Sequence, residues 1–362
     1  MTEISRLRIG FDIAKGVFQA HGVREEPGEP VAFVKRIKRG EVEKFFTRLP
    51  PSDIAMEACA SAHYWARLAQ HHGHEVRLIP PAYVKPYVRR NKTDANDAAA
   101  ICEAMSRPSM RFVPVKSQAD QALIMLHRTR AALVVQRTAL ANRIRAAFAE
   151  FGIVQPVGER GLNDLLSTIA KRADVFEQLP PALCMVLDEL AQQWASVNSA
   201  VRRFDAAIAA GLKTNTRAAR LTKIPVIGPA GASAIDAMLP NPHVFKSGRD
   251  FSAWIGLTPR EDSSGNTVRR GGISKKGDGY LRRLLVLGAT ARLALIRRGR
   301  AKNVSDWERK MAAHPKRKLA AVALANKSAR VASCWKRVFD TTAMLARNEI
   351  YRVPDGRCAA AA

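Results

Sequence analysis

The chain has 362 residues, enough for two or three domains that each bury a core of their own. Its 59 lysines and arginines outnumber its 32 aspartates and glutamates, and the formal net charge of +27 favours nucleic acid as a partner, or less often an acidic membrane surface. The sequence has no run of 18 apolar residues, no signal-peptide pattern at its start and no CxxC spacing among its five cysteines, which argues against a membrane protein, a secreted protein and a zinc or disulfide framework.

Residues 1–115 alternate between short apolar runs and helical stretches, which predicts an α/β domain. Paired prolines at 50–51 and 80–81 separate the runs, and Thr93 is placed to cap the last helix. The order of three strands, a helix, a strand, a helix, a strand and a helix is that of an RNase-H-like domain. The expected strands are Leu7–Asp12, Val17–Val23, Val31–Ile37, Ile54–Glu57 and Val76–Ile79, and two of the expected helices are Ala62–His72 and Thr93–Met105.

Residues 116–215 contain few glycines and long helical stretches. One series of apolar residues advances by alternating steps of four and three, the 3.5-residue repeat of a coiled-coil seam. An antiparallel helical hairpin that could also serve as an oligomer contact fits this pattern, and two amphipathic helices within one small bundle fit it equally well. The alternating series is Leu183, Leu187, Leu190, Trp194, Val197, Val201, Phe204 and Ile208, and an earlier series is Leu126, Leu133, Leu140, Ile144 and Phe151.

Residues 216–345 form a compact and basic region that begins like a helix–hairpin–helix. The expected helices are Arg217–Thr222 and Ala230–Leu239, joined by the sequence IPVIGP. Such a hairpin can aim the free backbone N–H groups of a helix start at a phosphate, and a plain pair of helices is the alternative. Residues 346–362 end in four alanines and are expected to form a flexible tail.

Four carboxylates of the first region lie where one folded site could collect them. Asp12 and Glu57 each end an expected strand, whereas Asp94 and Asp97 are three residues apart and therefore share one face of a helix. Like charges at that distance repel each other unless a cation lies between them, and oxygen ligands suit Mg²⁺ or Mn²⁺. Each carboxylate taken singly is more simply a solvated surface group, and the aspartate pair could merely favour the helix dipole.

A second candidate site is the polar segment PREDSSGN at residues 259–266, which has the composition of a turn. It leads into a run of basic residues and then to Asp278, which is placed to cap a helix from Tyr280 to Ala294. A serine hydroxyl on such a loop could attack a phosphate while neighbouring cations neutralise its oxygens. An ordinary polar loop that contacts phosphate is the simpler interpretation of the composition alone.

Two long sequence blocks carry a resemblance to a known family. They are MEACASAHYWARLAQHHGHEVRLIPPAYVKPYVRRNKTDANDAAAICEA and FSAWIGLTPREDSSGNTVRRGGISKKGDGYLRRLL. Together they resemble the insertion-sequence transposases of the DEDD–serine type, the insertion-sequence 110/1111 family, which includes the Piv-like DNA invertases. The resemblance extends from about residue 7 to 340. It implies a RuvC-like N-terminal domain at 1–115, a helical coiled-coil insert at 116–215 and a mainly α C-terminal transposase domain at 216–345.

Carried over by position, the resemblance implies that Asp12, Glu57, Asp94 and Asp97 bind Mg²⁺, or alternatively Mn²⁺. In DSSGN the serine of the family matches Ser263 best, with Ser264 as the alternative. The basic residues expected to bind nucleic acid are Arg269, Arg270, Lys275, Lys276, Arg282 and Arg283. Asn266 replaces the second glycine that usually follows the serine pair, and Val226 stands where a glycine is typical of the helical hairpin.

The resemblance also implies partners: double-stranded DNA, a structured noncoding guide RNA, and further copies of the chain in a dimer or tetramer whose active sites combine the carboxylates of one subunit with the serine of another. No membrane partner is expected, and the expected location is the bacterial cytoplasm, in association with the nucleoid. The leading hypothesis is an RNA-guided DNA recombinase with a serine nucleophile. The alternatives are a RuvC-like nuclease or junction resolvase that uses metal-activated water, and a nucleic-acid-binding protein without activity.

Overall fold

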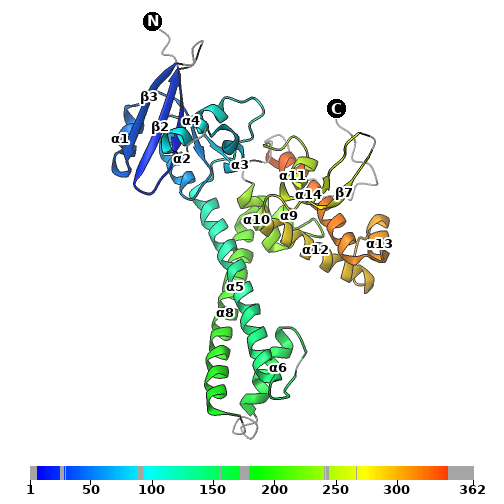
Figure 1. Cartoon of the computed structure of the whole chain (residues 1–362). Coiled ribbons are helices and arrows are strands. Elements are labelled where there is room, and N and C mark those ends of the chain that lie inside the picture. The colour runs from blue at the N-terminus through cyan, green and yellow to red at the C-terminus, as the bar shows by residue number, and fades with distance from the viewer. Residues whose placement is uncertain are drawn as a thin grey trace. The chain divides into compact units, whose positions relative to one another are not determined.

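The computed structural model describes residues 6–24, 28, 30–88, 93–154, 156–171, 179–239, 241, 244–265 and 267–340 (Figure 1). The chain divides into two compact units, Met1–Gln121 and Ala122–Ala362. The predicted tail at 346–362 lies outside the described residues. The division into parts at 1–115, 116–215, 216–345 and 346–362 stays a prediction. Among the helices of the described ranges, none is long and apolar enough to cross a membrane.

The first unit is an α/β domain around a five-stranded sheet with the order β3-β2-β1-β4-β5. The first three strands are antiparallel neighbours, whereas β1, β4 and β5 run parallel. All five predicted strands are confirmed with shifts of at most one residue. The strands are β1 Leu7–Asp12, β2 Val17–Arg24, β3 Val31–Lys38, β4 Asp53–Glu57 and β5 Glu75–Ile79.

Alternation along the strands gives this sheet two buried faces. One face packs Ile9, Phe11 and Met56 against helices α1 and α2, and the other face packs Ala55 and Ile79 against α4. The expected cap of α4 is confirmed, because the Thr93 hydroxyl accepts a hydrogen bond from the backbone N–H of Asn96. The helical elements are η1 Arg39–Glu41, α1 Val42–Arg48, α2 Ala62–His71, α3 Pro81–Val84, η2 Lys85–Tyr87 and α4 Asp94–Met105.

The second unit begins with two long helices, α5 Gln118–Ala149 and α8 Pro181–Thr214. They are antiparallel, because Arg130 pairs with Asp205 at 2.5 Å while Arg137, seven residues later, donates to Asn198 at 2.9 Å. A helix that the sequence analysis did not predict, α6 Glu159–Lys171, joins the same apolar cluster. The helical hairpin is therefore present, and coiled-coil packing within it stays a prediction. The cluster contains Leu140, Ile144, Phe148, Leu162, Leu165, Leu179, Leu187, Trp194 and Val197.

The rest of the second unit is a helical core that carries a two-stranded hairpin. Both helices of the predicted helix–hairpin–helix are present, and Asp278 caps α12 by accepting from the N–H of Leu281. His127 of α5 is buried between Ser233 and Tyr280, 3.0 and 3.1 Å from their hydroxyls, and burial lowers its pKa to about 4. The elements are α9 Thr216–Leu221, α10 Pro229–Met238, α11 Gly248–Ile255, β6 Pro259–Glu261, β7 Arg270–Ile273, α12 Gly279–Arg297, α13 Asp306–Ala313 and α14 Arg317–Asp340.

Candidate metal centre and serine hairpin

The strands β1 and β4 place Asp12 and Glu57 at the carboxyl end of the parallel strands. Both residues end their strands, and these strands are parallel neighbours in which Phe11 lies opposite Met56. Since side chains alternate between faces, Asp12 and Glu57 point to the face opposite that of Phe11 and Met56. This is the face that α4 covers.

Helix α4 brings two more carboxylates to that end of the strands, and a glycine in β1 allows the helix to approach the strand closely. Asp94 and Asp97 lie in the first turn of α4. Gly10 lies two residues before Asp12 on the same face, and a Cβ atom built on Gly10 would lie 2.0 Å from the carbonyl oxygen of Ala98. Only a residue without a side chain lets the backbones of β1 and α4 come this close. Gly10 was not among the predicted site residues, although its position inside a strand was the available signal.

Three of the four predicted carboxylates meet in the structure. One ligand oxygen from each of Asp12, Asp94 and Asp97 lies within 4.8 Å of the others. Glu57 is not part of that group, although its charge still acts on Asp12. Burial first, and then the negative charges of Asp97, Asp94 and Glu57, raise the pKa of Asp12 to about 6. Burial and the charges of Glu57 and Asp12 also raise the pKa of the nearby Cys59 thiol.

These residues suit a divalent cation. No described residue forms an ion pair with Asp12, Asp94 or Asp97, so their mutual repulsion has no compensation from the described side chains. Carboxylate oxygens are the ligands that Mg²⁺ and Mn²⁺ prefer, and a cation among them would remove the repulsion. The oxygens come from two rigid elements, a strand end and a capped helix start, so the site is preorganised.

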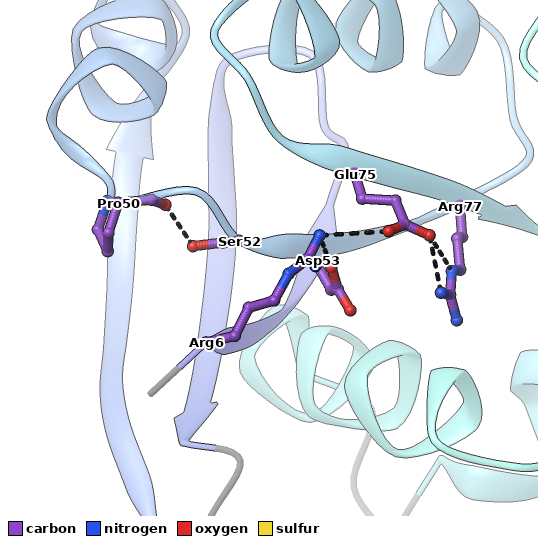
Figure 2. A network of polar contacts seen from close by, with 6 residues as sticks. All are labelled: Arg6, Pro50, Ser52, Asp53, Glu75 and Arg77. Carbon is purple, nitrogen blue, oxygen red and sulfur yellow. Dashed lines mark hydrogen bonds and ion pairs between the residues drawn. The ribbon is translucent and has the colours of Figure 1, made fainter. Parts of the chain in front are cut away.

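The opposite end of the sheet, at the amino ends of β4 and β5, also has acidic residues, but there each has a basic partner (Figure 2). Arg6 lies 2.6 Å from a carboxylate oxygen of Asp53 and 3.2 Å from one of Glu75. Arg77 donates to the other oxygen of Glu75 at 2.8 Å. The hydrogen bond from Arg77, more than any other contact, lowers the pKa of Glu75. This end of the sheet therefore has no excess negative charge for a cation to neutralise.

The predicted serine loop is the end of a hairpin formed by β6 and β7. Glu261 pairs with Arg270, and beyond this pair the backbones of Ser264 and Thr267 exchange hydrogen bonds of 3.1 and 3.2 Å. Gly265 between them has φ of +55°, as expected for the turn. Ser263 is exposed, and its hydroxyl donates to Oε1 of Glu261 at 3.3 Å. Glu261 was not among the predicted site residues.

The base of the hairpin is fixed by close backbone packing. Gly256 follows α11 as its C-cap with φ of +78°, and a Cβ atom there would lie 2.2 Å from the carbonyl oxygen of Lys276. Across the same contact, a Cβ atom on Gly277 would lie 1.7 Å from the carbonyl oxygen of Trp254. The guanidinium of Arg282 donates to the carbonyl oxygens of Ile255 and Lys276 at 2.6 and 3.0 Å. The hairpin thus extends from a rigid base.

The residues predicted to bind nucleic acid lie in the hairpin and in the segment that follows it, up to the first turns of α12. Arg282 is half-buried and braces the base, so its guanidinium is already engaged. The other five side chains are exposed, just before β7, on β7, on the loop after it and on α12. Exposed cations around a serine could contact phosphates. These five are Arg269, Arg270, Lys275, Lys276 and Arg283.

Comparison with known proteins covers both units of the chain. A profile described as the transposase IS116/IS110/IS902 family matches residues 218–304, which include the serine hairpin. A second transposase profile, of the DEDD type named for IS110, matches residues 9–153, which include all four carboxylates. This second match implies a RuvC-like fold, with which the observed α/β domain is consistent.

Individual relatives extend the match to nearly the whole chain. A putative transposase of Sinorhizobium fredii, y4pF/y4sB, is 44% identical over 97% of this chain and 87% of its own length. A transposase for insertion sequence element IS1328 of Yersinia enterocolitica is 38% identical over 90% of this chain and 95% of its own length. A pilin gene-inverting protein of Moraxella lacunata is 23% identical over 79% of this chain and 83% of its own length.

These matches define a transposase, an enzyme that cuts and rejoins DNA. The chain belongs to the IS116/IS110/IS902 family of insertion-sequence transposases. The resemblance found in the two sequence blocks is confirmed, and the inverting relatives match at lower identity.

Proposed function

We propose that this transposase moves an insertion sequence by cutting and rejoining DNA with Ser263 as nucleophile and a divalent cation, Mg²⁺ or Mn²⁺, at Asp12, Glu57, Asp94 and Asp97. The observation that carries the proposal is the group of three carboxylates within 4.8 Å, which lack a basic partner among the described residues. A cation bound there would neutralise charge on the reacting phosphate. The positive charge of the chain attracts the DNA.

The serine hairpin supports a covalent step. The Ser263 oxygen attacks phosphorus, a new oxygen–phosphorus bond forms, and the bond to one deoxyribose oxygen breaks. Glu261 lies within hydrogen-bond reach of the hydroxyl and takes its proton, the leaving oxygen receives a proton from water, and the protonated Glu261 returns its proton to the hydroxide that remains. The phosphoserine link keeps the energy of the phosphodiester, so a second DNA end can reverse the step and be joined without ATP.

The carboxylates belong to the first unit of the chain, which ends at Gln121, and the serine belongs to the second unit, which begins at Ala122. This division is compatible with an active site assembled from two subunits, which the family resemblance implies for a dimer or tetramer. The same resemblance implies a guide RNA from the element that pairs with donor and target DNA. Sequencing the nucleic acid that co-purifies with the chain tests this part, and bulk DNA without a discrete RNA contradicts it.

The decisive experiment incubates the full-length chain with DNA of the element ends and Mg²⁺ and then looks for a protein–DNA adduct that survives SDS. We expect the adduct with the unmodified chain and with Ser264→Ala, and its loss with Ser263→Ala. Glu261→Gln is expected to slow its formation by about 100-fold, the usual contribution of a general base. If DNA is hydrolysed without an adduct and Ser263→Ala has no effect, the alternative of a RuvC-like nuclease with activated water replaces the proposal.

A further inference from the structure

The edge strand β3 carries two cations on the same face of the sheet as the carboxylates. In the sheet register, Asp12 lies opposite Gln19 of β2, and Gln19 lies opposite Arg36 of β3. Directly opposed residues of antiparallel strands point to the same face, so Arg36 shares the face of Asp12. Lys38 follows two residues later, opposite Val17, and also points to this face. The cross-strand row of Asp12 and Gln19 therefore ends at Arg36 on the edge strand, and Lys38 lies beside it on the same face.

Both cations are available to a ligand. Arg36 and Lys38 are exposed, and neither forms an ion pair with a described residue. The basic residues next to them are placed differently. Lys35, on the other face of β3, lies over the ring of Phe45 with 5.7 Å to its centroid. Arg39 lies over the ring of Trp65 at 5.0 Å.

The spacing matches the backbone of a DNA strand. Neighbouring strands lie about 4.8 Å apart, so the backbone of Arg36 is about 10 Å from that of Asp12. Each DNA strand has one phosphate per about 3.4 Å of helix axis, and phosphates that wind around the axis are farther apart than this rise, so about 10 Å corresponds to at most about three nucleotides. A strand whose reacting phosphate lies at the carboxylates would thus pass another phosphate over β3.

We propose that Arg36 and Lys38 bind the sugar–phosphate backbone of the reacting DNA strand, within about three nucleotides of the phosphate at the carboxylates. The inference rests on the proposed function, because it needs the reacting phosphate at Asp12. The two contacts position the strand and read no sequence.

A simpler explanation is that the charges protect an exposed edge strand from pairing with another chain. That role needs charge on the edge but not on one particular face, and it predicts no effect on DNA binding. The two explanations therefore differ in a measurable way.

The test compares two double variants of the full-length chain, each freed of co-purifying nucleic acid. Arg36→Gln with Lys38→Gln removes the proposed site. Lys35→Gln with Lys44→Gln removes the same charge from the other face of the domain, where both residues are exposed. Affinity for a fluorescent duplex carrying one element end is measured in Ca²⁺ over a series of salt concentrations.

We expect the first variant to make the slope of log affinity against log salt shallower by about 1.8, because each lost phosphate contact contributes about 0.9. The control variant should keep the slope of the unmodified chain. Ethylation of single phosphates should interfere with binding within about three nucleotides of the cleaved bond, and this interference should vanish in the first variant. Equal slopes for the two variants, or interference at another position, overturn the proposal.

A parallel measurement separates this inference from the proposed function. Asp97→Asn is expected to bind the duplex with the slope of the unmodified chain and to lose cleavage in Mg²⁺. If Asp97→Asn cleaves normally, the proposed metal site is wrong, whatever happens at β3. If cleavage depends on Asp97 but the slope does not depend on Arg36 and Lys38, only the inference about β3 is wrong. A slope change that appears with the guide RNA and not with DNA assigns the cations to RNA and also overturns it.

Discussion

The two ends of the N-terminal sheet use the same residue types in opposite ways. At the amino ends of β4 and β5, Asp53 and Glu75 each pair with arginine, and the pKa of Glu75 is lowered. At the carboxyl end of β1, Asp12 faces further carboxylates, and its pKa rises to about 6. The first arrangement stabilises the fold by itself, whereas the second would become favourable with the cation of the proposed function. A charge that costs stability in the unliganded chain is therefore informative about function.

The largest expected difference between the two ends is in catalysis. Asp97→Asn should lower cleavage of element-end DNA by at least about 100-fold, because removing a direct ligand should cost no less than removing a residue that only supports one. It should not lower the melting temperature, since it removes a like charge beside Asp12. The matched change Asp53→Asn should lower the melting temperature and keep cleavage. The contrast between the ends disappears if both variants lose cleavage to the same extent.

The close packing of β1 and α4 should matter next. Gly10→Ala forces a methyl group against the backbone of Ala98 and should destabilise the chain by about 1–3 kcal/mol, measured by urea unfolding. Cleavage should fall as well, since α4 carries Asp94 and Asp97. Gly40→Ala is the control, because a Cβ atom there would meet nothing within 4 Å. Equal stability of the two variants would mean that Gly10 does not set the distance between strand and helix.

The dependence of stability on pH should have opposite signs at the two ends. Asp12 has a pKa of about 6 in the folded chain against a usual 3.8, so the folded state holds its proton more tightly. Its contribution to stability is thus greatest below the lower value and is lost as the pH rises through about 6. Glu75 has a lowered pKa and contributes stability that is lost as the pH falls.

Melting curves of the metal-free chain, measured over a range of pH, can separate the contributions of Asp12 and Glu75 to stability. Asp12→Asn should remove the loss of stability on raising the pH toward about 6, and Glu75→Gln should remove part of the loss at acidic pH. Adding Mg²⁺ above that pH should raise the melting temperature of the unmodified chain but much less that of Asp12→Asn. A Mg²⁺ effect of the same size in both would exclude Asp12 as a ligand.

The smallest effect is expected from the ion pairs at the amino end. Arg6→Gln removes the contacts to Asp53 and Glu75, and since Arg6 is about half exposed the loss should be at most about 1 kcal/mol. The loss should shrink at high salt, and cleavage should not change. A large loss of cleavage would show that the two ends are coupled.

Much of the fold could be predicted because local patterns decide it. Short apolar runs predicted the strands of the first unit, with paired prolines before β4 and after β5, and a capping threonine predicted the start of α4. The proximity of Asp94 and Asp97 followed from helical spacing, and that of Asp12 followed from its place at a strand end. The chemical roles of these residues and of Ser263 stay predictions.

Other features could not be predicted because they depend on contacts distant in sequence. The strands β6 and β7 have the sequences PRE and RGGI, which lack apolar alternation, and their pairing comes from the hairpin and its base. The helix α6 was not predicted because it lies between the two apolar series on which the helical hairpin was based. The importance of Gly10 emerges only when α4 is packed on β1.

The missing side chain at position 10 also affects which size of metal ion the proposed centre would accept. The separation between β1 and α4 fixes how far the oxygens of Asp12 lie from those of Asp94 and Asp97. Mg²⁺ is held at about 2.0–2.1 Å and Ca²⁺ at about 2.3–2.6 Å. Under the proposed function, pushing the helix outward by one methyl group would shift the preference of the centre toward larger ions, so the backbone beneath the site helps to select its metal.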